Sequence, residues 1–214
     1  MKTKKVIIID YGIGNVFSVL CAIERLGFEA ELTSDPRQIL GASRVILPGV
    51  GAFGRAAHKL REAGLDQAIY DYVKTGKPFL GICVGMQLLL EKGEEFGQHR
   101  GLGIIPGNVC KIFTKEQTGR TSRVPLIGWT SVQEARRGAW EGTPFSRDAR
   151  QNAFYFVHSY QAIVTDNSHS IAVHRLGDAE IVSAVRCENV LGVQFHPERS
   201  AETGQRFLRS FIAD

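Results

Sequence analysis

The chain has 214 residues, of which 43% are hydrophobic and 22% charged, an ordinary globular composition that needs neither a disulfide nor a metal to hold its core. The formal net charge of +4 is a weak excess spread along the chain. Nothing in the sequence resembles the clustered basic patch of a nucleic-acid-binding protein, so no nucleic-acid partner is expected, and no apolar run is long enough for a membrane span. The apolar stretch after the basic residues 1–5 ends at Asp10 and is too short for a signal peptide, so we expect a cytoplasmic protein.

The first half of the chain alternates short β-rich runs with helical stretches. The pattern predicts strands at 6–9, 29–33, 44–47 and 78–82, and helices at 15–26, 55–75 and 85–91, with Gly64 weakening the second helix. Such alternation is typical of an α/β domain with a mostly parallel sheet. The second half differs: it predicts strands at 154–162, 170–175, 181–186 and 191–195, then a helix at 201–212. The polar, Gly-rich segment 115–150 is interpreted as a mobile or insertion-bearing region.

Of the four cysteines, one lies on a sequence typical of a catalytic turn. The cysteines are far apart and form no Cys-x-x-Cys pair, which argues against a disulfide framework or a zinc site: Cys21, Cys83, Cys110 and Cys187. We expect no metal and no cofactor. The run Gly81-Ile82-Cys83-Val84-Gly85 joins a predicted strand to a predicted helix, as in the Gly-x-nucleophile-x-Gly elbow.

The elbow has a physical purpose. The nucleophile sits on a strained turn whose backbone is pressed against adjacent segments, so small neighbours are needed. The sulfur of Cys83 would then lie at a helix N-terminus, where the dipole and free N–H groups favour the thiolate, and the N–H of Val84 would face a developing oxyanion. The alternative is a small buried hydrophobic cysteine beside a helix start.

A second Gly-rich loop, residues 48–54, also follows a strand and precedes a helix. It is either a tight turn or a set of backbone donors aimed at an anion, with the N–H of Gly51 opposite that of Val84. The loop lacks the Gly-Lys-Ser/Thr ending of a P-loop, and the pair Gly12 and Gly14 lacks the third glycine of a dinucleotide site. Nucleotide binding is therefore disfavoured.

A reactive cysteine needs a base, and His196 is the best candidate among the six histidines. It ends an apolar strand that Pro197 stops, and Glu198 can fold back toward the imidazole, giving the order Cys, His, Glu. His158 lies on an aromatic strand with Phe156 on the same face, and we favour a role in lining the cleft. The other histidines are expected at the surface or in packing: His58, His99, His169 and His174.

These motifs resemble a known family. The runs 81–89 (GICVGMQLL) and 194–198 (QFHPE) are similar to the class I, triad-type glutamine amidotransferases. Three further runs narrow the resemblance to the glutaminase subunits of imidazole glycerol phosphate synthase, in histidine biosynthesis: 10–15 (DYGIGN), 47–53 (LPGVGAF) and 155–160 (YFVHSY). The resemblance implies a single domain over residues 1–214, with an open, mostly parallel, flavodoxin-like sheet flanked by helices and additional antiparallel strands in the C-terminal half.

The resemblance also implies an activity. A Cys83-His196-Glu198 triad would hydrolyse L-glutamine to glutamate and ammonia. Residues that bind the substrate or its oxyanion would be Gly51, Val84, Gln87, Glu95 and Tyr160. The partner would be a (β/α)-barrel cyclase subunit, joined in a heterodimer, which receives the ammonia through a channel and makes imidazole glycerol phosphate and AICAR.

One departure keeps alternatives open. Where the family commonly has Pro-His-Met-Gly-Trp-Asn, this chain has Pro-Leu-Ile-Gly-Trp-Thr, so Leu126 and Thr130 replace a histidine and an asparagine. A paralogous glutaminase subunit that feeds a different synthase, such as a sugar-amidating enzyme, is therefore the second hypothesis. A cysteine peptidase or other acyl hydrolase, and a regulatory subunit without activity, are hypotheses from other classes.

Overall fold

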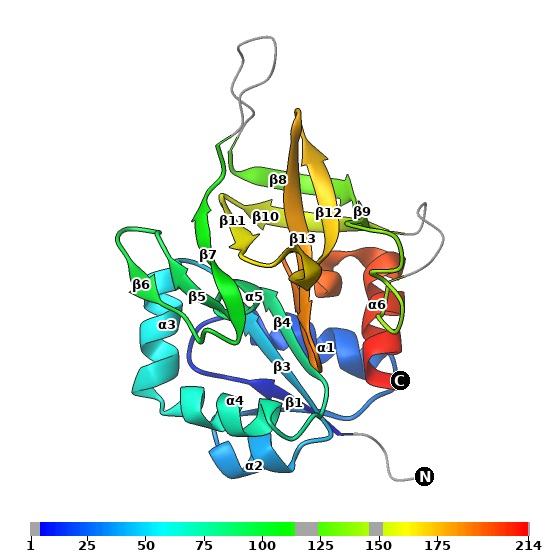
Figure 1. Ribbon diagram of the computed structural model, residues 1–214. Coiled ribbons are helices and arrows are strands. Elements are labelled where there is room, and N and C mark those ends of the chain that lie inside the picture. Colours follow the sequence, from blue (N-terminus) through cyan, green and yellow to red (C-terminus); the bar gives the residue numbers. More distant parts are fainter. Residues whose placement is uncertain (1–4, 114–123, 146–151, 214) are drawn as a thin grey trace.

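The centre of the fold is an eight-stranded sheet, seen in the computed structural model, which describes residues 5–113, 124–145 and 152–213 (Figure 1). Five adjacent strands are parallel, in the order β2 (Ala30–Thr33), β1 (Val6–Ile9), β3 (Arg44–Gly49), β4 (Phe79–Cys83) and β14 (Val190–Val193). Three antiparallel strands continue the sheet: β13 (Ala179–Cys187), β12 (Ser170–Leu176) and β9 (Gln133–Glu134). The predicted fold class, a mostly parallel sheet with added antiparallel strands, is confirmed.

Helices cover both faces of the parallel strands, which explains why every residue of β1, β3, β4 and β14 is buried. In Figure 1, α4 lies in front of these strands and α1 behind them. The helices are α1 (Val16–Arg25), α2 (Pro36–Gly41), α3 (Phe53–Glu62), α4 (Leu65–Val73), α5 (Val84–Gln87) and α6 (Ala201–Ala213), with 3-10 turns η2 (Asn167–His169) and η3 (Pro197–Arg199). None of the helices in the described ranges is long and apolar enough to cross a membrane.

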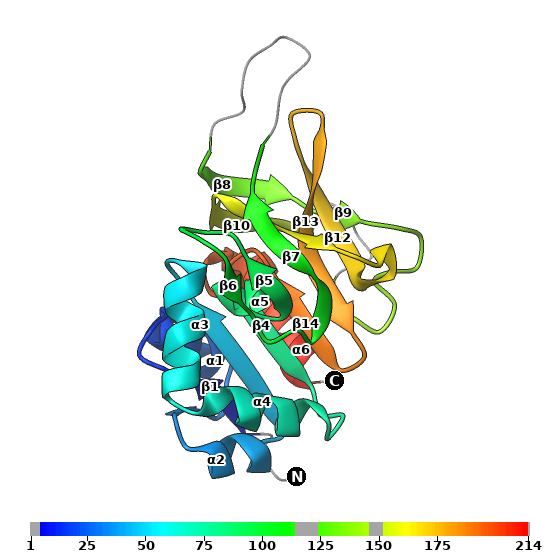
Figure 2. The same cartoon turned by 60° about the vertical axis from the view of Figure 1, so that its left-hand side comes forward.

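Two smaller sheets lie beyond α5, at the end of β4 (Figures 1 and 2). One has the strand order β11 (Tyr160–Val164), β7 (Ile105–Lys111), β5 (Leu90–Gly93) and β6 (His99–Arg100). The other pairs β10 (Ala153–His158) with β8 (Leu126–Ser131), antiparallel. Their position matters because ligands of open α/β sheets bind beyond the carboxyl ends of the parallel strands.

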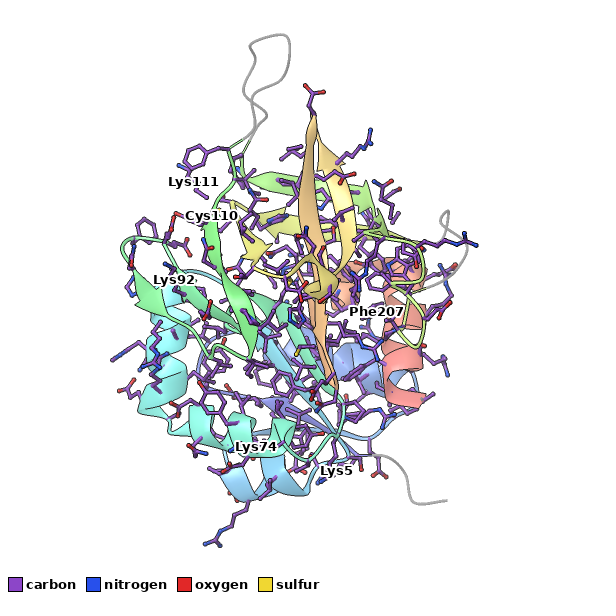
Figure 3. The ribbon with its side chains drawn as sticks, in the orientation of Figure 1. Lys5, Lys74, Lys92, Cys110, Lys111 and Phe207 are labelled. Carbon is purple, nitrogen blue, oxygen red and sulfur yellow. The ribbon has the colours of Figure 1, made fainter. Side chains whose placement is uncertain are left out.

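An aromatic cluster anchors the segment that follows β14. The ring of Phe195 stacks on Phe154 of β10, with centroids 3.8 Å apart and an interplanar angle of 16°. Phe207 of α6, labelled in Figure 3, meets Phe195 edge-on with centroids 5.5 Å apart. Offset and edge-on aromatic pairs add about 0.5–1.5 kcal/mol each beyond their buried area. The cluster thus fixes the backbone next to His196.

Two predicted helices were wrong in extent. The helix over 55–75 is two helices, α3 and α4, because Gly64 adopts the left-handed conformation with φ +66°, which a helix interior does not allow. The helix over 85–91 ends at Gln87, and β5 begins at Leu90. Here long-range pairing overrides helix propensity, since Leu90 pairs with Ile105 of β7.

The second half also differs in detail from the prediction. The single strand expected over 154–162 breaks at Ser159 into β10 and β11, which pair in different sheets. The strand β7 was not predicted. Residues 126–131 and 133–134 form β8 and β9, so the interpretation of 115–150 as a mobile or inserted region does not hold there. Residues 115–123 and 146–150 of that segment lie outside the described residues.

Candidate active site

The elbow around Cys83 has the strain expected of a nucleophile turn. Cys83 is the last residue of β4 and has φ +54° and ψ −112°, a conformation that costs a non-glycine residue of the order of 1–3 kcal/mol. Both flanking glycines are required by packing. A Cβ on Gly85 would collide with the carbonyl oxygen of Leu47, and one on Gly81 would lie 2.7 Å from the carbonyl oxygen of Gly85. The expected reason for the small neighbours is therefore confirmed.

His196 and Glu198 form the second part of the site. The imidazole Nδ1 lies 2.8 Å from Glu198 Oε1, and both side chains are almost fully buried. The His196 backbone is held on both sides, because its N–H donates to the carbonyl of Tyr155 at 2.9 Å and its carbonyl accepts from the Ser200 hydroxyl at 2.6 Å. These bonds orient the ring so that Nδ1 faces the carboxylate.

Cys83 and His196 line the same pocket and influence each other electrostatically. Burial by itself lowers the pKa of His196, but hydrogen bonding and charge from Cys83 and Glu198 outweigh burial and raise the pKa to about 10. Nε2 is buried and has no partner of full hydrogen-bond geometry among the described residues. The two side chains are thus close enough to interact electrostatically, and the raised pKa of His196 favours an imidazolium at neutral pH.

A pocket of about 370 Å³ gathers most of the predicted site residues. The predicted residues that line it are Cys83, His196, Gly51, Val84, Gln87, Glu95 and Tyr160, and Glu198 lies behind His196. Residues far apart in the sequence therefore meet at one place, at the carboxyl ends of β3 and β4. Phe96 and Pro125, which the sequence did not single out, also line this pocket.

The loop with Gly51 is held from below by Tyr11. The buried hydroxyl of Tyr11 donates to the carbonyl of Pro48 at 3.1 Å, and burial raises the pKa of Tyr11, so this hydroxyl stays protonated. A Cβ on Gly49 would lie 2.8 Å from the same hydroxyl. Gly51 has φ +86°, which suits glycine. Gly51 and Val84 both lie at the pocket, as a pair of oxyanion donors requires.

The three remaining candidates, Glu95, Gln87 and Tyr160, are also held by hydrogen bonds within the protein. Glu95 accepts a hydrogen bond from the backbone N–H of Phe53 at 2.8 Å through Oε2, at the start of α3. Gln87 donates to the backbone carbonyl of Tyr160 at 3.4 Å and to Gln194 Oε1 at 3.0 Å. Each candidate therefore meets the pocket with part of its hydrogen-bonding capacity already used by the protein.

Two further histidines lie near the pocket, His158 in its wall and His174 next to His158. His158 lines it, as expected, and its Nδ1 lies 2.9 Å from the carbonyl oxygen of Tyr160. Burial is the main influence that lowers the pKa of His158 to about 4, and burial likewise lowers that of His174 to about 3. His174 packs against the Phe156 ring and lies 2.8 Å from the Ser183 hydroxyl through Nδ1. Both imidazoles are therefore neutral at neutral pH, and neither is a base for Cys83.

Sequence reasoning missed Gln194. This fully buried residue donates from Nε2 to the sulfur of Cys83 at 3.7 Å. The alternation of the run before His196 could have revealed it, because residues two apart on an extended segment point to the same side. In the described part of the chain, no three His, Cys, Asp or Glu side chains gather as a metal site requires.

Comparison with known proteins relates this site to a family. The family model for glutamine amidotransferase class-I matches residues 7–214. The imidazole glycerol phosphate synthase subunit HisH of Sulfurimonas denitrificans is 41% identical over 204 residues, which cover 95% of each chain. The proteins of the same name from Rhodopirellula baltica and Geobacter sulfurreducens are 43% and 40% identical, and cover 95% and 97% of each chain.

Solved structures agree on the fold. A crystal structure of glutamine amidotransferase has a TM-score of 0.67 at 22% identity and covers 97% of each chain. The structure of PurLQS from Thermotoga maritima has a TM-score of 0.73 at 19% identity, over 99% of this chain and 98% of that one. These two similarities concern the fold alone. The family match and the full-length relatives show that the chain belongs to the class I glutamine amidotransferase family.

Proposed function

We propose that the chain is the glutaminase subunit of an imidazole glycerol phosphate synthase, folded as one domain over residues 1–214, which hydrolyses L-glutamine to glutamate and ammonia. The observation that carries the proposal is the union of Cys83, His196 and the buried carboxylate of Glu198 at one pocket. Support for the choice of synthase comes from the three relatives at 40–43% identity that carry the name of this subunit.

The geometry supports a two-step reaction through a thioester. The Cys83 thiolate attacks the side-chain carbonyl carbon of glutamine, and the N–H groups of Gly51 and Val84 stabilise the oxyanion. His196, as imidazolium, gives its proton to the leaving nitrogen, which departs as ammonia. The neutral imidazole then takes a proton from a water molecule that attacks the thioester, and glutamate leaves as the C–S bond breaks. Removing one oxyanion donor typically raises such a barrier by roughly 3–4 kcal/mol.

The remaining hypotheses have less support. The paralogous subunit was suggested by Leu126 and Thr130, but the relatives named as imidazole glycerol phosphate synthase subunits align over nearly the whole chain. For the peptidase, the pocket of about 370 Å³ suits a small molecule better than an extended peptide. The presence of all three triad residues argues against a regulatory subunit without activity.

We also propose the partner, a (β/α)-barrel cyclase that takes the ammonia directly. Ammonia in water at neutral pH is mostly protonated and is then no nucleophile, so its transfer has to avoid bulk solvent. A docking surface is available on β8, where the alternate residues Ile127 and Trp129 are 61% and 54% exposed. Exposed apolar side chains of this size, side by side, are typical of a protein interface. A free thiol nucleophile suits a reducing compartment, so we propose the cytoplasm.

The test uses the complex with the cyclase. The variant Cys83→Ala should lose glutamine-dependent synthesis and keep synthesis from added ammonia, whereas Cys110→Ala, a half-buried cysteine outside the pocket, should keep both. We expect the isolated chain to be weakly active and the cyclase with its nucleotide ligand to activate it. Release of ammonia from glutamine by Cys83→Ala would show that the nucleophile is wrong. Failure to co-purify with a barrel cyclase would remove the choice of synthase.

A further inference from the structure

A chain of side-chain amides leads from the β10–β11 corner to the nucleophile. Gln87 donates from Nε2 to the backbone carbonyl of Tyr160 at 3.4 Å and to Gln194 Oε1 at 3.0 Å. Gln194 in turn donates from Nε2 to Cys83 Sγ at 3.7 Å. Gln87 and Gln194 are both buried, and the backbone N–H of Gln194 is fixed by the carbonyl of Ser183 at 2.9 Å.

The hydrogen bonds from Gln87 through Gln194 to Cys83 can run in only one direction. A backbone carbonyl can only accept, so the Tyr160 carbonyl fixes the NH₂ end of Gln87. The second N–H of Gln87 then requires an acceptor, which fixes Oε1 of Gln194 on that side. The NH₂ end of Gln194 is left to face Cys83. If either amide were reversed, two acceptors or two donors would face each other in the interior, where an unpaired polar group is destabilising.

Two consequences follow for the reaction. A donor beside the sulfur favours the thiolate over the thiol, because hydrogen bonds to the charged form stabilise that form. On the pocket side, both N–H groups of Gln87 are used within the protein, so Oε1 is the only part of its amide that is left for a ligand. That oxygen can only accept, and it therefore suits an N–H group of the substrate.

We propose that Gln194 is a positioning residue for glutamine hydrolysis: it orients the amide of Gln87 so that an acceptor faces the substrate, and it presents an N–H to the Cys83 thiolate. This inference rests on the proposed function. Gln194 would then have two effects, one through its oxygen and one through its N–H group, which different substitutions can separate. The acceptor of Gln194 acts on substrate binding through Gln87, and the donor of Gln194 acts on the ionisation of the sulfur.

Two substitutions in the complex with the cyclase separate these effects. Gln194→Leu removes donor and acceptor together. Gln194→Glu keeps an oxygen for Gln87 but places a second oxygen, in place of the N–H, beside the sulfur. The control Asn189→Leu removes another amide with two hydrogen bonds, to the carbonyls of Val73 and Lys77, at the opposite end of β14. The readouts are kcat and KM for glutamine, and the rate of Cys83 alkylation by iodoacetamide against pH, followed by mass spectrometry of the Cys83 peptide.

We expect Gln194→Leu to raise KM roughly tenfold and to move the midpoint of the alkylation profile up by roughly one to two pH units, as loss of a hydrogen bond to a charged group implies. Gln194→Glu should move the midpoint at least as far while KM changes less than threefold. Asn189→Leu should lower thermal stability and change neither readout. Co-elution with the cyclase and a cooperative thermal unfolding transition report that each variant chain is folded.

The proposal is overturned if both Gln194 variants keep the wild-type midpoint, or if KM rises equally in both. If Gln194→Leu does not fold, Gln194→Glu decides alone: an unchanged midpoint refutes the role of the donor, and a KM raised tenfold refutes the role of the acceptor. A wild-type complex that does not hydrolyse glutamine, yet shows the same alkylation differences, would remove the proposed function and leave the action of Gln194 on Cys83 standing.

Discussion

The substitution Glu198→Gln tests how much of the activity depends on a buried charge behind His196. Glu198 accepts from Nδ1 of His196 at 2.8 Å through Oε1, its side chain is 1% exposed, and its Oε2 has no hydrogen-bond partner among the described residues. Glutamine has almost the same shape. It keeps an oxygen on Nδ1 and places an NH₂ group where Oε2 was. The change therefore removes the negative charge and preserves the packing.

The magnitude follows from the kind of bond that is weakened. A hydrogen bond to a charged group contributes about 1.5–3 kcal/mol, roughly twice a neutral bond, and this one lies out of solvent where screening is small. The His196 imidazolium, which protonates the leaving nitrogen and forms again when water attacks the thioester, loses that stabilisation, whereas the neutral imidazole does not. A barrier raised by about 2–3 kcal/mol corresponds to a fall of roughly 30- to 150-fold in kcat/KM.

The assay is glutamine hydrolysis by the complex with the cyclase, at saturating cyclase ligand. The matched control is Glu202→Gln on α6, since the Glu202 side chain is 90% exposed and its nearest cation, Arg206, lies 4.0 Å away. The control should leave kcat/KM within a factor of two. If Glu198→Gln also stayed within a factor of two of the wild type, the buried charge would have no part in catalysis and the triad would reduce to Cys83 and His196.

The same pair makes stability depend on pH. The pKa of His196 is raised to about 10 in the folded chain, above its ordinary value of 6.5. Its stabilising contribution is therefore fully present below about pH 6.5 and is lost as the pH rises through about 10. The free energy of unfolding in urea, compared between wild type and Glu198→Gln, should differ most near pH 6.5 and least near pH 10. A difference that grows toward pH 10 would contradict this assignment.

Two further substitutions test the frame of the site. Gly85→Ala should destabilise the chain by more than about 2 kcal/mol in urea unfolding, because the new Cβ collides with the Leu47 carbonyl oxygen. The control Gly41→Ala, where a new Cβ meets no atom within 4 Å, should be near neutral. Equal effects of the two substitutions would refute the packing argument. Tyr11→Phe should lower stability by about 1 kcal/mol, because the carbonyl of Pro48, next to the Gly51 loop, loses its hydrogen-bond donor. It should also lower kcat more than it raises KM. An unchanged kcat would show that Tyr11 does not position the Gly51 loop for catalysis.

The sequence alone was sufficient for those features that depend on a few neighbouring residues. The buried strands β1, β3 and β4 could be read from their unbroken apolar runs, which a parallel sheet covered on both faces requires. The elbow at Cys83 could be recognised because its two glycines are demanded by close backbone contacts. His196 and Glu198 lie two residues apart around a proline, so their contact is local as well.

Only the tertiary structure decided the features that depend on pairing between distant segments. The early end of α5 and the break at Ser159 exist because the flanking residues pair with β7 and β8, whose strands carry no clear pattern of their own. The place of Gln194 is of the same kind. Gln194 follows the last residue of β14, and the partners that orient its side-chain amide are 107 and 111 positions away in the chain. Nearby residues in the sequence determine the Cys83 turn and the His196–Glu198 contact. The direction of the hydrogen-bonded network through Gln194, in contrast, depends on the groups that folding brings to both of its ends.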